Sequence, residues 1–448
     1  MMYQKLFDAV EAYKDVILKA ERDLNSMPEL GFREWKTHAY LKARFEELGY
    51  KLTELENIPG FYTDVDTGRP GPKIVVFAEL DGLPCPGHPF ADPETTAAHA
   101  CGHHCQCAGL IGVAAALKAE GALDEMCGSV RLFAVPAEEG VSASYREELK
   151  KSGRTRYFAG KSEVLYRGLL DDVDIAMMAH LRSGPMKMTC PKGTNGNVRK
   201  KATFIGKSAH AGGSPHKGVN ALYAATTALS AANALRETFQ EADTIRMHPI
   251  ITKGGNVVNA IPDEVVVENM IRGGDYEAVG QINKKINRAF AGAAAAMGCR
   301  LYLEDVAGSA PRINDKNLQD LFHSVALNFF KEEEMEFNKV WGKASSDMGD
   351  ICNVIPSVHP YIGGGVGVGH TAGFLVEDAY TACVIGAKII SGVLKQLLME
   401  NAALAKKVIA EKKVPYASKE EFFKAKDALD FEGDSVVYND DGSVTLLV

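Results

Sequence analysis

Residues 129–140 read SVRLFAVPAEEG, a mostly apolar run that ends at a proline and is followed by two adjacent acids. The run Ser129–Val135 has the length and apolar character of a buried strand. Pro136 stops the strand, so Glu138 and Glu139 come at its carboxyl end. Paired acids are usually only solvated, but the position after an apolar strand makes burial and a functional role the better interpretation here.

Two similar apolar runs occur elsewhere in the chain, and each is also followed by a chemically active residue. KIVVF at 73–77 is followed by Asp81, and DIAMMA at 174–179 is followed by His180. Apolar strands that alternate with helices predict an α/β fold with a largely parallel sheet. In such sheets ligands bind outside the carboxyl ends of the strands, so we expect these side chains and the two acids to meet at one edge.

Most other segments of this larger domain are expected to be helical. Apolar residues recur at three- and four-residue spacing over 6–24 and 40–48, and 108–117 reads as a buried helix of small residues. The stretch 141–167 is longer than a simple connection and is a candidate cover for the site. A long helix is expected over about 378–397.

Between these parts the pattern restarts as a smaller domain. Its predicted elements are a strand at 201–205, a helix at 219–239, strands at 246–252 and 264–271, a helix at 276–297 and a strand at 300–303. This β-α-β-β-α-β order is that of a ferredoxin-like domain. The predicted domains are a discontinuous one over 1–192 and 308–400, an insertion over 193–307, and a C-terminal extension over 401–448.

Composition narrows the class of protein. The 448 residues include 50 Lys and Arg and 58 Asp and Glu, a net charge of −8, which argues against a nucleic-acid-binding protein. The sequence contains no uninterrupted run of 18 apolar residues, so it predicts no membrane helix. The N-terminal segment is charged throughout, unlike a secretory signal. The 9 cysteines, an odd number, suit a reducing compartment, so we expect a cytoplasmic protein.

The densest group of metal-ligand residues is HACGHHCQC at 99–107. Cys101 and His103 can both reach one metal ion from a turn, because Gly102 lets the backbone fold tightly between them. Alone, the pattern also fits buried cysteines and histidines at a helix start, and a single histidine such as His180 is more often a core residue. Their common position at one sheet edge makes a metal centre the leading interpretation.

The chain resembles a known family, the aminoacylase/carboxypeptidase-like metallopeptidases. The closest part of it is the amidohydrolase branch, with N-acyl amino acid amidohydrolases, auxin-conjugate hydrolases and aminobenzoyl-glutamate hydrolases. The segments that carry the resemblance occur in the family's order: PELGFREWKT (28–37), AELDGLP (78–84), HACGHH (99–104), VPAEEG (135–140), MMAH (177–180), GKSAHAGGSP (206–215), GGNVVNAIPD (254–263), SSDMGD (345–350) and GHTAGF (369–374).

The resemblance implies a metal-binding α/β/α catalytic domain with an inserted ferredoxin-like α+β domain that serves as dimerisation domain and lid, and hence a homodimer. It implies one or two divalent ions per chain, Zn or Mn first and Co or Ni next. The implied metal ligands are Cys101, His103, Glu139, His180 and His370. The implied catalytic residues are Glu138 as general base, Asp81 behind the metal site and His210 as an oxyanion donor, and the implied substrate contacts are Asn259 and Arg272.

The sequence departs from the family pattern just after Gly102. His104 stands where the family usually has Asp or Asn, and Gln106 where a histidine or small polar residue is common. Cys105 and Cys107 are unusual additions, which we interpret as thiols on a helix face, with a place in the metal site as the alternative. Cys85 is interpreted as a thiol that takes no part in the metal site.

These observations predict a hydrolase of amide bonds. Its substrates would be N-acyl amino acids, aminobenzoyl-glutamate-like conjugates or dipeptides, attacked by a metal-activated water whose proton Glu138 takes. Five candidate protein ligands exceed the four that a single tetrahedral zinc uses, which favours two ions. The alternatives are a Cys101-dependent hydrolase, a non-catalytic binding protein on a degenerate hydrolase scaffold, and a structural zinc protein.

Overall fold

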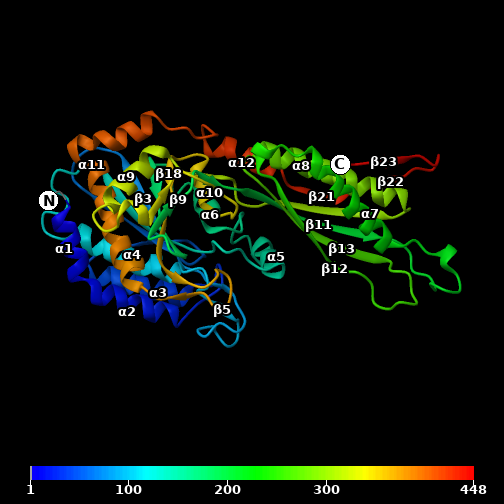
Figure 1. Cartoon of the computed structure of the whole chain (residues 1–448), viewed down its shortest axis with the longest axis horizontal. Coiled ribbons are helices and arrows are strands. Elements are labelled where there is room, and N and C mark those ends of the chain that lie inside the picture. The colour runs from blue at the N-terminus through cyan, green and yellow to red at the C-terminus, as the bar shows by residue number, and fades with distance from the viewer. Residues whose placement is uncertain (1–2) are drawn as a thin grey trace. The chain divides into compact units, whose positions relative to one another are not determined.

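The computed structural model describes residues 3–448 and divides them into two compact units (Figure 1). Unit 1 comprises Met1–Gly193, Ile313–Gly342 and Ser346–Lys419. Unit 2 comprises Thr194–Arg312, Lys343–Ser345 and Glu420–Val448. The two units are described one at a time.

Unit 1 is built on a six-stranded sheet in the order β1-β2-β6-β3-β7-β18. Its strands are β1 (Thr53–Glu54), β2 (Phe61–Asp66), β3 (Lys73–Glu79), β6 (Ser129–Val135), β7 (Ile175–Met177) and β18 (Ser357–Val358). β6, β3, β7 and β18 run parallel, while β2 is antiparallel to β6. The largely parallel sheet predicted from the apolar runs is confirmed.

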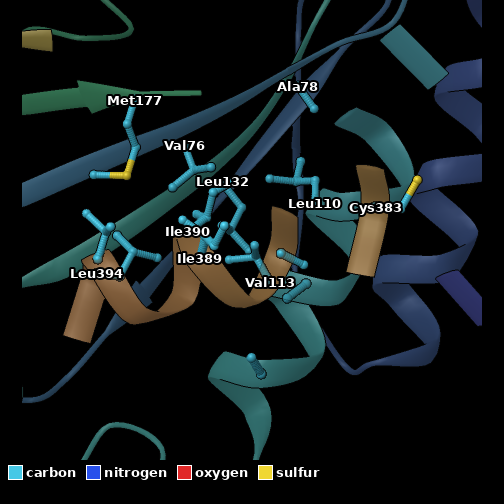
Figure 2. Packing of buried hydrophobic residues seen from close by; sticks show 14 of the residues in the cluster. Val76, Ala78, Leu110, Val113, Leu132, Met177, Cys383, Ile389, Ile390 and Leu394 are labelled. Carbon is cyan, nitrogen blue, oxygen red and sulfur yellow. The ribbon is translucent and has the colours of Figure 1, made fainter. Parts of the chain in front are cut away.

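The central strands are apolar on both faces, as buried parallel strands are. Figure 2 shows Val76, Ala78 and Leu132 packed with residues of the helices on one face. The alternate residues Phe77 and Phe133 point to the other face, where their ring centroids are 5.6 Å apart. Burial on both faces explains why KIVVF and SVRLFAV are nearly continuous apolar runs.

The predicted helical segments of unit 1 are confirmed apart from their boundaries, and further helices occur at 143–152, 160–166, 316–326 and 348–352. The helices of unit 1 are α1 (Gln4–Ala12), α2 (Lys14–Asn25), α3 (Trp35–Glu47), α4 (His103–Lys118), α5 (Ala143–Ser152), α6 (Gly160–Tyr166), α9 (Lys316–Ala326), α10 (Met348–Cys352), the π-helix η5 (Tyr380–Ile385) and α11 (Gly386–Ala410). The first predicted helix is two helices, because the chain breaks at Tyr13 between α1 and α2. The stretch 141–167 contains α5 and α6.

Helix α4 is the central helix of unit 1. It packs against β3 and is surrounded by α1, α2, α3, α11 and η5. Nearly all of its residues are buried, which accounts for its small apolar sequence. The helical segment Tyr380–Ala410, which comprises η5 and α11, has the length and mean hydropathy (1.6) of a membrane span, but 83% of its most apolar window is buried, so we interpret it as a core segment.

A second sheet of unit 1 has the order β16-β9-β19-β20, with β8 paired to β19. Its strands are β8 (His180–Ser183), β9 (Met188–Cys190), β16 (Met335–Phe337), β19 (Tyr361–Val366) and β20 (Leu375–Val376). The segment 354–362 contains two strands, β18 and the start of β19, which lie in different sheets. His180 begins β8, shortly after β7 ends at Met177.

Unit 2 has the predicted split β-α-β order. Its elements are β11 (Gly196–Ile205), α7 (Ala221–Ala234), β12 (Arg246–Lys253), β13 (Glu264–Gly273), α8 (Tyr276–Ala296) and β14 (Arg300–Ala307). The sheet order is β12-β13-β11-β14, all antiparallel, with β21 (Phe431–Asp434) added beside β14. The alanines of α7 and the apolar face of α8 form its core.

The structure differs from the predicted C-terminal extension 401–448. The predicted helix ends close to residue 397 as expected, because the backbone at Met399–Ala402 is non-helical, and beyond this kink a second helical segment of α11 runs to Ala410. From Glu420 the chain belongs to unit 2, where β21 extends the sheet and β22 (Val436–Tyr438) and β23 (Val444–Leu446) form a hairpin. The tail is therefore shared between the two units, because both halves of it bury apolar residues there.

Candidate metal centre

Three parallel strands bring the predicted residues to one edge of the main sheet of unit 1. Asp81 follows β3, Glu138 and Glu139 follow β6, and His180 follows β7. Since β6, β3 and β7 are neighbours and parallel, their carboxyl ends lie side by side. His370 comes from the loop after β19, and its backbone N–H donates to the carbonyl of Ala100 at 2.8 Å.

Cys101 and His103 flank the start of α4, and the glycine between them sets their positions. Gly102 caps the helix in the left-handed region, at φ +95°. A Cβ at this position would lie 2.6 Å from the side chain of Leu181. Glycine is therefore required for both the backbone conformation and the close approach of β8.

The five predicted metal ligands form two overlapping triads. We call these five residues the open cluster; they are Cys101, His103, Glu139, His180 and His370. One triad is Cys101, His103 and His180, and the other is Cys101, Glu139 and His370, each with its ligand atoms within 4.8 Å of one another. Cys101 Sγ lies 3.4 Å from His180 Nε2, and His370 Nε2 lies 3.4 Å from Glu139 Oε1. The thiol of Cys101 belongs to both triads, which is the position of a ligand shared by two ions.

Asp81 fixes the orientation of two members of the open cluster. Its Oδ1 lies 3.1 Å and its backbone oxygen 2.9 Å from His103 Nδ1, while its Oδ2 accepts the backbone N–H of Glu139 at 2.9 Å. His180 Nδ1 similarly lies 2.6 Å from the carbonyl of Leu181. With Nδ1 occupied, Nε2 is the ring nitrogen that each histidine directs to the cluster, as in metal-binding histidines.

The residues present suit a divalent metal ion. Among the described residues, the buried atoms His103 Nε2 and Glu139 Oε1 make no hydrogen bond of good geometry, although they are 3.9 Å apart and Glu79 Oε2 lies 3.1 Å from His103 Nε2. Buried polar atoms without a partner are unfavourable, and a bound cation would satisfy both. One thiolate, three imidazoles and one carboxylate form a donor set suited to Zn, Mn, Co or Ni.

Glu138 lies beside the cluster, within 4.8 Å of ligand atoms of His103 and Glu139. Burial, together with the charges of Glu79, Glu139 and Asp347, raises its pKa well above that of an ordinary glutamate. A carboxyl group of raised pKa at a cluster of metal ligands has the properties of a general base.

Sequence reasoning missed a buried ion cluster beneath Glu138. Lys161, from α6, contacts Glu79 and also Asp347, whose Oδ1 is 2.6 Å from Lys161 Nζ, and all three side chains are fully buried. Glu79 Oε2 in turn lies 3.1 Å from His103 Nε2. Burial opposes ionisation of Glu79, but the charges of Lys161, His103 and His180 together lower its pKa to about 2. Glu79 and Asp347 could have been found from the sequence, because they lie inside the family segments AELDGLP and SSDMGD. Nothing in the sequence around Lys161 indicates that it belongs with them.

A pocket of about 450 Å³ opens onto the open cluster within unit 1. Cys101, His180 and His370 are among its lining residues. Its other polar lining residues include Arg182, Ser183, Thr189, Glu336 and Tyr361. Arg182 is half-buried, and burial lowers its pKa despite the nearby Glu336. Arg182 was also missed, although it follows His180 closely in the sequence.

The other three predicted residues, His210, Asn259 and Arg272, lie in unit 2. His210 is exposed, and its Nδ1 accepts the backbone N–H groups of Gly212 (3.1 Å) and Gly213 (2.9 Å), which leaves Nε2–H as a donor. Asn259 is exposed, and its backbone carbonyl accepts a hydrogen bond from the backbone N–H of Ala211 at 2.9 Å. Arg272, on β13, donates to Ser345 Oγ at 2.8 Å, and burial lowers its pKa.

The unusual cysteines of α4 do not contribute to the open cluster. Cys101, Cys105 and Cys107 all carry free thiols. Cys107 Sγ donates to the carbonyl of Glu79 at 3.0 Å, and Cys105 is buried beside His104. Neither belongs to a triad with Cys101 among the described residues.

Comparison with known proteins identifies relatives of both units. Residues 192–297 match the family model described as "Peptidase dimerisation domain". An uncharacterized hydrolase of Sinorhizobium fredii is 27% identical over 82% of this chain and 90% of its own length. The N-acetyl-L-cysteine deacetylase of Bacillus subtilis is 27% identical over 69% of this chain and 72% of its own length.

A solved structure shares the fold over most of the chain. It is that of a Bacillus subtilis protein described as a dinuclear metal-binding peptidase from the M20 family, with a TM-score of 0.67 and 21% identity. The match covers 87% of this chain and 99% of that protein. The fold of an α/β catalytic domain with an inserted dimerisation domain is thus shared with that structure.

Proposed function

We propose that this chain, which belongs to the M20 peptidase family, is a metal-dependent amidohydrolase that cleaves the amide bond of N-acyl amino acids, aminobenzoyl-glutamate-like conjugates or dipeptides. The observation that carries the proposal is the juxtaposition of two ligand triads sharing Cys101, the carboxyl group of Glu138 and a pocket of about 450 Å³. The Xaa-Arg dipeptidase of mouse and a p-aminobenzoyl-glutamate hydrolase of Escherichia coli, 27% and 25% identical, support this substrate class.

The open cluster would hold one or two divalent ions through Cys101, His103, Glu139, His180 and His370. The membership of Cys101 in both triads favours two ions, and Zn or Mn suits the donors best. When bound, such an ion acts as a Lewis acid and lowers the pKa of water to about 7.

Glu138 is proposed to move the proton of the reaction. A carboxylate oxygen of Glu138 takes the proton from the attacking water and later donates it to the nitrogen of the leaving amine. Burial, followed by the charges of Glu79, Glu139 and Asp347, raises the pKa of Glu138, so it accepts a proton more readily than an ordinary glutamate. Asp81 positions His103 and the backbone of Glu139 without touching the substrate.

For substrate recognition, the pocket of unit 1 offers Arg182, whose guanidinium suits a carboxylate at one end of the substrate. The roles of His210 as oxyanion donor and of Asn259 and Arg272 as substrate contacts stay proposals. His210→Ala should lower kcat more than it changes KM if its Nε2–H stabilises charge that develops in the reaction.

We also propose that the chain forms a homodimer through unit 2. β21 covers the sheet edge at β14, so the edge that stays open in unit 2 is β12. β12 carries the exposed apolar residues Ile250 and Ile251, 51% and 39% exposed. An open strand edge with apolar side chains is a surface suited to pairing with a second copy. Light scattering of the purified chain tests this, and a monomer would contradict it.

The deciding experiment measures bound metal and turnover together. Protein purified without chelator is analysed for metals, and amine release is followed with N-acetyl and N-benzoyl amino acids, aminobenzoyl-glutamate and several dipeptides. The assays are repeated after chelator treatment and after adding back Mn or Zn. We expect turnover that is lost with the metal and regained with it.

The same experiment separates the competing functions. Turnover that survives chelation would point to a Cys101-dependent hydrolase, which burial disfavours because it raises the pKa of the Cys101 thiol. Absence of turnover with every substrate, at full metal occupancy, would point to a binding protein.

A further inference from the structure

A second group of metal-ligand side chains lies at the first turn of α4, separate from the open cluster. His104 and Cys105 come from α4, Glu21 from α2 and Cys383 from η5. We call these four residues the closed cluster. All four are buried, with exposures of 1% for His104, 3% for Cys105, 5% for Glu21 and 0% for Cys383.

The distances among three members of the closed cluster, Glu21, His104 and Cys105, suit ligands of one tetrahedral metal ion. His104 Nε2 lies 3.3 Å from Glu21 Oε1 and 3.6 Å from Cys105 Sγ, and the three ligand atoms are all within 4.8 Å of one another. Usual zinc bond lengths at tetrahedral angles place N and O ligands about 3.3 Å apart and N and S ligands about 3.6 Å apart. Cys383 is the candidate for the fourth ligand, because it is fully buried on η5, which packs against both α2 and α4.

Three helical segments converge on this point. η5 packs against both α2 and α4, so its residues meet those two helices inside unit 1. Figure 2 shows Cys383 on the segment before α11, with its sulfur turned away from Ile389 and Leu394 and toward the N-terminal helices. A metal ion at the closed cluster would therefore join α2, α4 and η5, which are far apart in sequence.

Ordinary hydrogen bonding does not satisfy these groups. Both Glu21 Oε1 and Cys105 Sγ approach the same ring nitrogen of His104, and one imidazole nitrogen has a single hydrogen or lone pair to offer. The other nitrogen, His104 Nδ1, is buried without a hydrogen-bond partner in the part of the chain that the structure describes. Over the same residues, His104 is the only basic side chain within 4 Å of the buried Glu21 carboxylate.

We propose that the closed cluster binds one zinc ion, with Glu21, His104, Cys105 and Cys383 as its ligands. Two thiolates, an imidazole and a carboxylate form a soft donor set that suits zinc and excludes Mg²⁺ and Ca²⁺. Four protein ligands leave no position for a substrate, so the site is structural. This site is additional to the metal centre of the proposed function and does not depend on it.

The first test uses the unaltered protein. It is treated with a chelator until turnover is lost and is then analysed for zinc, with circular dichroism to check that it remains folded. We expect one zinc ion per chain to remain, because a buried site with four protein ligands exchanges slowly. A folded chain without zinc after this treatment would overturn the proposal.

The second test separates the two clusters by their thiolates. In the Cys101→Ser variant loaded with Co²⁺, a thiolate-to-cobalt absorption band can come only from outside the open cluster. We expect the band to persist in Cys101→Ser and to disappear in Cys101→Ser with Cys105→Ser. Cys101→Ser with Cys107→Ser is the matched control, since Cys107 is on the same helix and equally buried but donates to Glu79.

The remaining outcomes are also decisive. Absence of the band in Cys101→Ser, or its survival after Cys105→Ser, would overturn the assignment. Should the double variant fail to fold, Glu21→Gln preserves the shape of the cluster and removes one charged ligand. We expect Glu21→Gln to lose its retained zinc to the chelator faster than the unaltered protein, and an unchanged rate would contradict the role of Glu21.

Discussion

The open and closed clusters use the same kinds of side chain, and both draw on the first residues of α4. They differ in access. The His370 side chain is 54% exposed and lines the pocket of about 450 Å³, whereas every member of the closed cluster is buried. The open cluster also has Glu138 beside it, while the carboxylate of the closed cluster, Glu21, is itself a proposed ligand. The comparison teaches that access and a neighbouring base, rather than the ligand types, separate a catalytic metal site from a structural one.

The sharpest test of this difference is Glu138→Gln. We expect kcat to fall by about 10²- to 10⁴-fold, because the variant loses the group that accepts and returns the proton. Metal content should be unchanged in both clusters, because Glu138 is not among the proposed ligands. Steady-state kinetics with the best substrate of the panel, together with elemental analysis, measure the two effects.

The matched control for this variant is Glu148→Gln, an exposed acid on α5. It should change neither kcat nor metal content. If Glu138→Gln kept nearly normal turnover, the proton would have to be moved by another group, and the distinction between the clusters would lose its chemical basis.

The next largest effect is expected at Lys161, whose ion pairs lie beside the open cluster. Lys200, a buried lysine of unit 2, serves as the comparison. Lys161→Met leaves the fully buried Glu79 and Asp347 without their cation, and we expect a loss of about 3–5 kcal/mol of stability. Lys200→Met should cost less, about 1–3 kcal/mol, because the carboxylate of Asp305 keeps two amide donors. Those donors are the Nδ2 atoms of Asn283 and Asn287, at 2.7 and 2.8 Å.

The pKa values of the two lysines also differ, as their stabilising effects are expected to. Burial opposes the charge of Lys161, but Asp347 and Glu79 together raise its pKa, whereas burial lowers the pKa of Lys200. Urea denaturation compares the stabilities, and kinetics show which lysine matters for the site. Because Glu79 contacts His103, only Lys161→Met should also lower kcat. Equal losses in both assays would mean that Lys161 is merely structural.

How much of this could be predicted from sequence depends on distance along the chain. The run Ser129–Val135 is a strand with those bounds, since apolar runs buried on both faces leave a clear pattern. Asp81, Glu138 and His180 could be predicted to meet because each follows a parallel strand. Lys161 could not, since its partners are 82 and 186 positions away and its segment reads as a polar loop.

The closed cluster illustrates the same limit. His104 and Cys105 are visible in the sequence as departures from the family pattern, but they indicate no site without partners. Glu21 and Cys383 become partners only when α2 and η5 pack against α4. Side chains that converge from separate helices share no spacing rule, whereas the carboxyl ends of parallel strands do.

Gly102→Ala should affect both clusters at once, because Gly102 sets the start of α4. An alanine there must adopt φ near +95°, and its Cβ would lie 2.6 Å from the side chain of Leu181. We expect a loss of about 2 kcal/mol of stability and weaker metal retention at both sites. Thermal unfolding and metal analysis measure these effects.

Gly109→Ala is the control for Gly102→Ala on the same helix. Its Cβ would meet its nearest neighbour, the carbonyl oxygen of Cys383, at 3.5 Å, and alanine favours a helix, so stability and metal content should be kept. If Gly102→Ala lost metal from one cluster alone, the two clusters would be set independently.

The smallest expected effect is at the outer surface of the helices that enclose the closed cluster. Glu11 of α1 binds Lys388 Nζ at 2.7 Å and the hydroxyl of Tyr380, the first residue of η5, at 2.7 Å. The hydrogen bond from Lys388, followed by those from Tyr380 and Lys14, lowers the pKa of Glu11 from 4.5 to about 2. A lowered folded-state pKa means that the stabilisation is complete above about pH 4.5 and is lost as the pH falls toward 2.

Glu11→Gln should therefore be less stable than the unaltered protein at pH 7, by less than about 1 kcal/mol because the pair is partly exposed. The urea midpoints of the two proteins should converge as the pH is lowered through this window. A gap that is constant with pH would mean that Glu11 acts by packing and not by its charge. Because Glu11 contacts η5 at Tyr380 and not at Cys383, zinc retention in the closed cluster should stay unchanged throughout.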